Sequence, residues 1–233
     1  MTGVQTCALP ICIVFNRDGT MFITTGERAI MRDEAQNPAG HLGKMIRLKL
    51  DGSVPDDNPK LPGWAPEVWS IGHRNSQGAA LDPVTGKLWT IEHGARGGDE
   101  LNHPEKGKNY GWPVITYGRD YSMLPIGEGS AKAGMEQPVY YWDPSIATSG
   151  LAFYTGELFP DWKGNIFVGG LNGQHLARLV MKDGRVVAHE KLLEDMGERI
   201  RDVRSGPDGA LWLLTDDARD GRVLRIVPER GAP

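Results

Sequence analysis

The sequence has no block of basic residues and no long apolar run. Lys and Arg are scattered and the formal net charge is −4, so the charge pattern does not indicate a nucleic-acid partner. No apolar stretch approaches the roughly 20 residues that a membrane helix requires. The N-terminus lacks the basic segment of a signal peptide, and Pro10 interrupts its apolar run. We therefore expect neither a nucleic-acid partner nor a membrane span.

Cysteine is also scarce: the chain has two, Cys7 and Cys12, and both lie in the opening stretch MTGVQTCALPIC. This stretch is uncharged and aperiodic, whereas the following IVFNRDGTMFITTGE has the form of a strand, a turn and a second strand. Reverse translation of TGVQTCALPI fits a common short-read sequencing adapter. We expect residues 1–12 to be an adapter artefact, in which case cysteine usage says nothing about disulfides or redox compartment.

The remaining composition is that of a soluble globular protein. Of the 233 residues, 24% are charged and 39% are hydrophobic, which is enough to bury the core of one or two domains. The 31 glycines and seven tryptophans favour a β protein that is rich in turns and has large aromatic anchors.

One pattern recurs in four segments of the chain. Each segment is a polar turn ending in Gly, then a short alternating or apolar run, and a second strand follows later. The segments are 15–27, 81–94, 159–173 and 206–217. Amphipathic helices are scarce, and the best candidates are the short stretches 27–35 and 191–202. Four related strand units favour a β-propeller, with a β-sandwich as the alternative.

Polar side chains gather in GHRNSQG, residues 72–78, between two predicted strands. The Arg74 guanidinium can bind a carboxylate or a carbonyl oxygen, and Asn75 adds a directed amide. Taken alone, the motif is at least as well explained as a turn stabilised by its own side chains.

A second motif, EHGARGGDELN, begins at Glu92. Its glycines allow backbone carbonyls to turn inward, and acidic residues from Asp99 to Asp120 supply hard oxygen ligands. This combination suits calcium. A transition metal on His93 and His103 is disfavoured because their spacing fits no helical ligand pair, and a solvated acidic loop is the simpler alternative.

The third motif is ERIRDV, residues 198–203, in which Arg199 and Arg201 alternate along a predicted strand and therefore share a face. Two adjacent guanidinium groups repel each other unless an anion lies between them. The pair is either an ordinary surface feature or an anion clamp.

Together these motifs resemble the soluble, quinone-dependent aldose sugar dehydrogenases of the glucose/sorbosone dehydrogenase family. GHRNSQG, EHGARGGDELN, GKNYGWP and ERIRDV occur in the family's order, and the resemblance extends from about Ile13 to Val227. It implies a six-bladed β-propeller that binds pyrroloquinoline quinone (PQQ) and Ca²⁺. We expect residues 13–230 to form part of such a domain, with about four blades.

The resemblance also assigns roles to individual residues. Arg74 and Asn75 would contact the quinone, with Arg74 near the carbonyl that receives hydride. The other predicted cofactor contacts are His93, Ser145, Asn172, Arg199 and Arg201. Gly94 and Ala95 would ligate the cofactor's calcium through backbone carbonyls, although the family usually has Pro at the position of Ala95. A second, structural calcium site would involve Glu100, Tyr110 and Asp120.

The family's general base is a His, and its position corresponds to Ala8 in this chain. The implied reaction is oxidation of an aldose at the anomeric carbon to the lactone, with hydride transfer to PQQ and an external electron acceptor. We expect the parent protein to be periplasmic or secreted and the printed chain to be an inactive fragment of it. The alternative is a non-catalytic propeller that binds a sugar or a protein partner.

Overall fold

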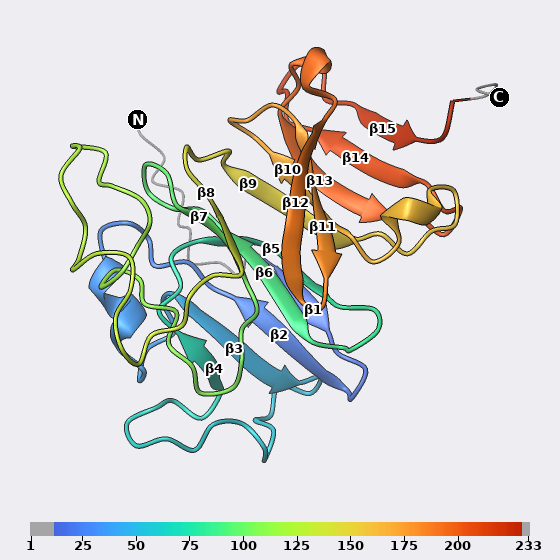
Figure 1. Cartoon of the computed structure of the whole chain (residues 1–233). Coiled ribbons are helices and arrows are strands. Elements are labelled where there is room, and N and C mark those ends of the chain that lie inside the picture. Colours follow the sequence, from blue (N-terminus) through green and yellow to red (C-terminus); the bar gives the residue numbers. More distant parts are fainter. Residues whose placement is uncertain (1–11, 230–233) are drawn as a thin grey trace. The chain divides into compact units, whose positions relative to one another are not determined.

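The computed structural model describes residues 12–229, and within them the protein is built almost entirely of β-strands. Fifteen strands form four antiparallel sheets, and each sheet is made of strands that are consecutive in the sequence (Figure 1). Strands joined in sequence order form the meander of a propeller blade. The prediction of an all-β, propeller-type fold with about four blades is confirmed.

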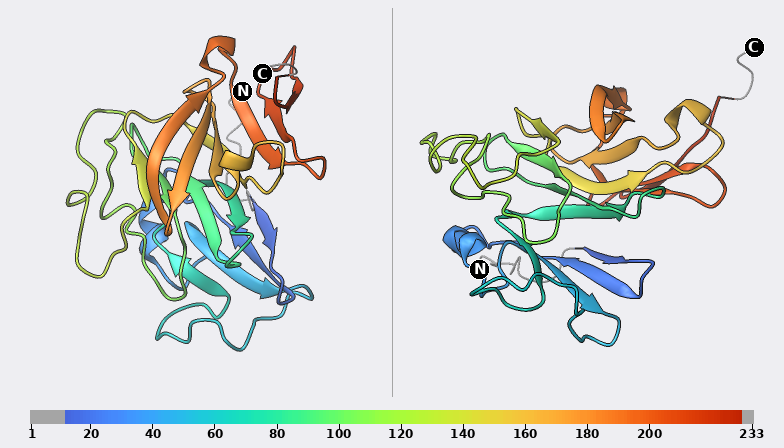
Figure 2. Two further views of the ribbon diagram at one scale, coloured as in Figure 1. Left: turned by 45° about the vertical axis from the view of Figure 1, so that its right-hand side comes forward. Right: turned by 60° about the horizontal axis from the view of Figure 1, so that its bottom comes forward.

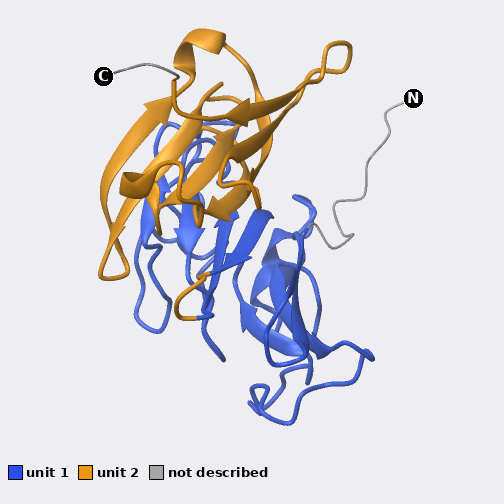
Figure 3. Ribbon diagram, turned by 90° about the vertical axis from the view of Figure 1, so that its right-hand side faces the viewer, with its two compact units in different colours: residues 1–81, 86–145 blue, residues 82–85, 146–233 orange. Residues whose placement is uncertain are grey.

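The described chain divides into two compact units, coloured in Figure 3. Unit 1 contains residues 12–81 and 86–145, and unit 2 contains residues 82–85 and 146–229.

Unit 1 contains two four-stranded sheets. The first has β1 (Ile13–Phe15), β2 (Thr20–Thr24), β3 (Lys44–Lys49) and β4 (Val68–Ile71). The second has β5 (Ser76–Leu81), β6 (Leu88–Glu92), β7 (Asp99–Asn102) and β8 (Tyr140–Trp142). Phe22, Met45, Ala79 and Leu88 form an apolar core between these strands, and burial of such side chains is the main stabilising contribution.

Unit 2 contains one four-stranded and one three-stranded sheet. The first has β9 (Thr148–Phe153), β10 (Ile166–Gly170), β11 (Leu176–Lys182) and β12 (Arg185–Leu192), and its β11–β12 hairpin is orange in Figure 2. The second has β13 (Ile200–Ser205), β14 (Leu211–Thr215) and β15 (Val223–Ile226). β9 and β10 pack on β13 around a core that includes Tyr154 and Phe167.

Neither of the two predicted helical stretches forms an α-helix. In residues 27–35 the helical part is the short 3₁₀ helix η1 (Arg32–Gln36), which begins at Arg32. Residues 191–202 contain the single turn η3 (Glu194–Met196) between β12 and β13, and Gly197 ends it in the left-handed conformation. The remaining helical turn is η2 (Pro160–Trp162). Within residues 12–229 no helix has the length and apolarity to cross a membrane.

Candidate functional site

The candidate site lies in unit 1, at the end of the second sheet where β5 begins and β6 finishes. Ser76, the first residue of β5, pairs with Glu92, the last residue of β6. This register places the β4–β5 connection, which carries Arg74, beside His93 and Gly94. The amide of His93 donates a hydrogen bond of 3.0 Å to the carbonyl of Asn75 and ties the two connections together.

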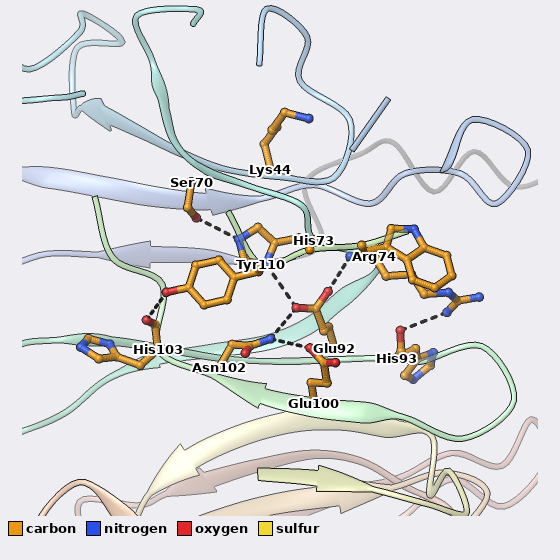
Figure 4. A network of polar contacts seen from close by, with 12 residues as sticks. Lys44, Ser70, His73, Arg74, Glu92, His93, Glu100, Asn102, His103 and Tyr110 are labelled. Carbon is orange, nitrogen blue, oxygen red and sulfur yellow. Dashed lines mark hydrogen bonds and ion pairs between the residues drawn. The ribbon is translucent and has the colours of Figure 1, made fainter. Parts of the chain in front are cut away.

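The guanidinium of Arg74 is held by backbone carbonyls. Its NH1 donates to the carbonyl of His93 at 3.1 Å (Figure 4). The same NH1 donates to the carbonyl of Gly94 at 2.5 Å. The group lies 5.2 Å from the ring centroid of Trp112, which is a cation–π distance, and its Nε is 3.8 Å from the carboxylate of Glu27. With 13% of its side chain exposed, Arg74 is a largely buried cation in a defined position.

The backbone N–H of Arg74 is hydrogen-bonded to a buried carboxylate. Glu92 accepts the backbone N–H of Arg74 at 2.5 Å and also contacts His73 and Asn102 (Figure 4). Burial would raise the pKa of Glu92, but the hydrogen bonds from these three groups outweigh it and hold the pKa below its ordinary value. Glu92 is therefore ionised inside the protein.

The loop after β6 is closed tightly around Gly94. Its amide donates to Asp99 at 2.9 Å, and a Cβ at this position would collide with the backbone of Gly97 and Gly98. The hydroxyl of Ser145 donates to the same carboxylate at 2.7–2.8 Å. Asp99, one of the acidic residues noted in the sequence, thus holds this loop in shape.

Glu100 and Tyr110 line one small cavity together with Arg74, Glu92 and Gly94. Its volume is about 10 Å³, close to that of a single water-sized group. Burial, followed by the charges of Glu92 and Asp99, raises the pKa of Glu100 to about 8. Its carboxylate accepts one hydrogen bond of 3.1 Å from the amide of Asn102.

Asp120 is placed differently from Glu100 and Tyr110. It is half-buried, and its carboxylate accepts hydrogen bonds from the amide and hydroxyl of Ser122, which lower its pKa. Its other oxygen is 3.6 Å from Arg32, and Asp120 is not among the residues that line the cavity. The structure thus brings two of the three predicted residues of the second calcium site together.

The two histidines weighed as transition-metal ligands lie at opposite ends of β6. His93 follows its last residue, whereas Nδ1 of His103 is 2.7 Å from the carbonyl of Leu88, its first residue. Within residues 12–229 no group of three or more His, Cys, Asp or Glu side chains has the arrangement of a metal site.

The predicted arginine pair lies in unit 2 with a carboxylate between its members. Arg199 binds Asp216 at 2.7–3.0 Å through NH2 and Nε, and Arg201 binds the other oxygen at 3.0–3.2 Å. Arg199 directly precedes β13, so both guanidinium groups share one side as predicted. Asn172 is also in unit 2, where its amide donates to the carbonyl of Ile146 at 2.9 Å.

Residues that the motif analysis did not select also shape the site, namely Glu27, Glu92 and Trp112. Glu92 opens the motif EHGARGGDELN, directly before the two residues whose carbonyls bind Arg74. A carboxylate at the end of a fully buried strand was the signal that could have identified it, because such a group needs specific partners.

Four sheets of consecutive strands and a polar site at one sheet end define an all-β protein of the propeller class. The family model described as Glucose / Sorbosone dehydrogenase matches residues 8–225. The chain therefore belongs to the glucose/sorbosone dehydrogenase family.

Individual relatives agree with this family. The chain is 46% identical over 220 residues to aldose sugar dehydrogenase YliI of Escherichia coli, and the match covers 93% of this chain and 59% of that protein. Among solved structures, one described as glucose dehydrogenase is 51% identical with a TM-score of 0.90, and covers 94% of this chain and 64% of that one. The PQQ-bound form of aldose sugar dehydrogenase from Streptomyces coelicolor is 31% identical with a TM-score of 0.73, and covers 91% and 60%. The chain thus spans about half to two thirds of the length of these relatives.

Proposed function

We propose that the parent protein of this chain oxidises aldose sugars at the anomeric carbon to the lactone, with PQQ and Ca²⁺ as cofactors. The observation that carries this proposal is the placement of Arg74. Its guanidinium is largely buried, oriented by two carbonyls and supported by Trp112. Such a fixed cation is suited to stabilise negative charge that develops on a bound acceptor.

The residues of the β6–β7 loop fit calcium. The carbonyl of Gly94 already points at a positive group, Arg74, at 2.5 Å, which is the electrostatic requirement for a metal-binding carbonyl. Backbone oxygens are ligands that Ca²⁺ prefers, and a backbone ligand tolerates the Ala95 side chain. We assign Gly94 and Ala95 to the calcium that accompanies the quinone.

The second calcium site is supported by Glu100 and Tyr110. Glu100 presents a partly buried carboxyl group whose described partner is the neutral amide of Asn102, so a divalent cation in the cavity would favour its ionised form. Asp120 would have to leave Arg32 and Ser122 to join them. Asp120 remains the third residue of the proposed site.

Arg199 and Arg201 fit the carboxylates of the quinone. They already bind a carboxylate, that of Asp216, from both sides. An anionic ligand would compete with Asp216 for these two groups. Asn75, His93, Ser145 and Asn172 remain predicted contacts, although the hydroxyl of Ser145 also serves Asp99.

When bound, the quinone supplies the hydride acceptor and calcium supplies Lewis acidity. The chain's own residues orient and stabilise: Arg74 faces the developing charge, while Glu92 and Asp99 fix the loops that carry it. The proton acceptor of the family falls at Ala8, which lies outside the described residues. We propose that the printed chain does not turn over for this reason, since loss of a general base typically costs about 10²–10⁴ in rate. A periplasmic or secreted location and an external electron acceptor complete the proposal.

The test is a chimera in which residues 1–12 are replaced by the N-terminal part of the E. coli relative. The chimera is incubated with PQQ, Ca²⁺, several aldoses and a dye acceptor, and lactone is measured. We expect turnover by the chimera and none by the printed chain.

Two variants of the chimera test the assigned roles. Arg201→Ala should weaken PQQ binding by about 1.5–3 kcal/mol, the value of a charge-assisted hydrogen bond. Arg74→Ala should lower kcat more than it weakens binding. A chimera that folds and binds sugar without turnover would favour the non-catalytic alternative instead.

A further inference from the structure

Glu92 is a buried carboxylate that contacts the backbone of Arg74. It is 3% exposed, at the end of a strand whose five residues are all buried. One oxygen, Oε2, accepts the amide of Arg74 at 2.5 Å. The other, Oε1, lies 3.2 Å from Nδ1 of His73 and 2.8 Å from Nδ2 of Asn102. Both oxygens are therefore engaged, and one of them is committed to Arg74.

His73 extends this contact into the protein interior. An ionised carboxylate can only accept hydrogen bonds, so Nδ1 of His73 carries the proton that faces Glu92. Its Nε2 is 2.8 Å from the hydroxyl of Ser70, and its ring stacks on Tyr110 at 4.8 Å. Ser70 and His73 are fully buried, so the chain from Ser70 to Glu92 is shielded from solvent and has a single set of partners.

Both ends of Arg74 are bound by three consecutive residues. The Glu92 side chain holds its backbone, and the carbonyls of His93 and Gly94 hold its guanidinium. On the opposite side, the carbonyl of Arg74 accepts the amide of Glu27 at 3.0 Å. A shift of Glu92 would therefore move the start of the Arg74 side chain relative to the carbonyls that hold its end.

We infer that Glu92, supported by His73, is a positioning residue that sets the location of the Arg74 guanidinium. The inference rests on the proposed function only for its catalytic consequence, because the geometric part concerns the chain as it stands. Charge-assisted hydrogen bonds that a backbone N–H donates to a carboxylate are stronger than neutral ones, which suits an anchor. A displacement of about 1 Å in a catalytic group is enough to reduce a rate about 10²-fold.

Two substitutions separate the reach of Glu92 from its charge. Glu92→Asp keeps the charge but shortens the side chain by one methylene, so it cannot contact His73 and Arg74 together. Glu92→Gln keeps the reach, but its amide N–H₂ then faces the N–H₂ of Asn102. The matched control is Thr90→Val: Thr90 is two residues earlier on β6, fully buried, and its hydroxyl makes no hydrogen bond within residues 12–229.

The first measurement is amide hydrogen exchange at Arg74 in the 233-residue chain, which requires no cofactor. We expect exchange to accelerate about 10- to 100-fold in Glu92→Asp and less in Glu92→Gln, with Thr90→Val unchanged. Fluorescence of Trp112 should change in the same order, because Arg74 lies over its ring. Unchanged exchange in Glu92→Asp, or an equal change in Thr90→Val, would overturn the inference.

The second measurement is a double-mutant cycle in the loaded chimera. Glu92→Asp should lower kcat about 10- to 100-fold with little change in the KM for the aldose, and Glu92→Gln should recover part of the loss. In an Arg74→Met background, Glu92→Asp should have no further effect on kcat. Additive effects would show that Glu92 does not act through Arg74. An inactive wild-type chimera would contradict the proposed function alone, and the exchange experiment would still decide the geometry.

Discussion

Replacement of Glu100 by Gln tests the electrostatics of the buried cavity. The pKa of Glu100 is raised from 4.5 to about 8, first by burial and then by Glu92 and Asp99. Because the folded-state pKa lies above the unfolded one, the unfolded chain releases this proton first as the pH rises. As the pH rises from about 4.5 to about 8, Glu100 therefore progressively lowers the free energy of unfolding. A Gln at this position does not titrate and has no such effect.

The size of the effect follows from the pH interval. At pH 7 the solution lies about 2.5 pH units above the ordinary pKa, which corresponds to about 3 kcal/mol. Glu100 retains partial exposure, so solvent screening reduces the expected effect to about 1–2 kcal/mol. Gln can still accept the hydrogen bond of Asn102, so the substitution removes the charge with little change in packing.

The assay is urea unfolding of the printed chain, followed by tryptophan fluorescence with a chelator present, between pH 5 and pH 8.5. We expect Glu100→Gln to match the wild type at pH 5 and to exceed its stability by about 1–2 kcal/mol at pH 7. The exposed residue Glu128, changed to Gln, is the control. Parallel pH profiles for wild type and Glu100→Gln would refute the reasoning.

If Glu100 is a calcium ligand, added calcium should make the wild type more stable than Glu100→Gln, which reverses the order expected without calcium. At a calcium concentration of about 100 times Kd, ligand linkage stabilises the wild type by about 2.7 kcal/mol and leaves Glu100→Gln unchanged. Equal stabilisation of both proteins would remove Glu100 from the calcium site without affecting the pH result.

Three further predictions concern groups outside this cavity. Lys44→Met should lower the free energy of unfolding by about 3 kcal/mol in the urea assay. The reason is that the buried ammonium group of Lys44 donates to three backbone carbonyls at 2.6–3.0 Å. The control, Lys60→Met at an exposed position, should change the free energy of unfolding by less than about 0.5 kcal/mol. Gly94→Ala should lower Tm and cost about 2–3 kcal/mol because its Cβ meets backbone atoms, whereas Gly40→Ala, whose Cβ would make ordinary contacts from 3.5 Å outward, should leave Tm nearly unchanged. Asp216→Asn should tighten PQQ binding several-fold and make this binding more dependent on salt, because the substitution neutralises the carboxylate that competes for Arg199 and Arg201. If the wild type and Asp216→Asn each bound PQQ with equal affinity at low and high salt, the anion-clamp assignment would be contradicted.

The strand units and the polar motifs were predictable from the sequence because their signals are local. A polar turn ending in Gly and an alternating run are complete within about ten residues, and β2, β6, β10 and β14 form in the four segments that carry this pattern. The shared side of Arg199 and Arg201 followed from the two-residue period of extended chain. The helical stretches were misjudged because their residues are drawn into tight turns between strands, where packing overrides a weak preference.

The partners of the buried carboxylates were decided only by the tertiary structure. Glu92 meets the amide of Arg74 across 18 positions, and Asp99 meets Ser145 across 46. These pairs depend on the strand register and on which ends of the sheets come together. No short sequence pattern determines the register or this juxtaposition. For the same reason Asp99 holds a loop, Asp216 lies between two arginines, and Asp120 lies apart from Glu100. Residue types determined which chemistry was available, and burial determined which carboxylate had to be paired because an unpaired buried charge is too costly to retain.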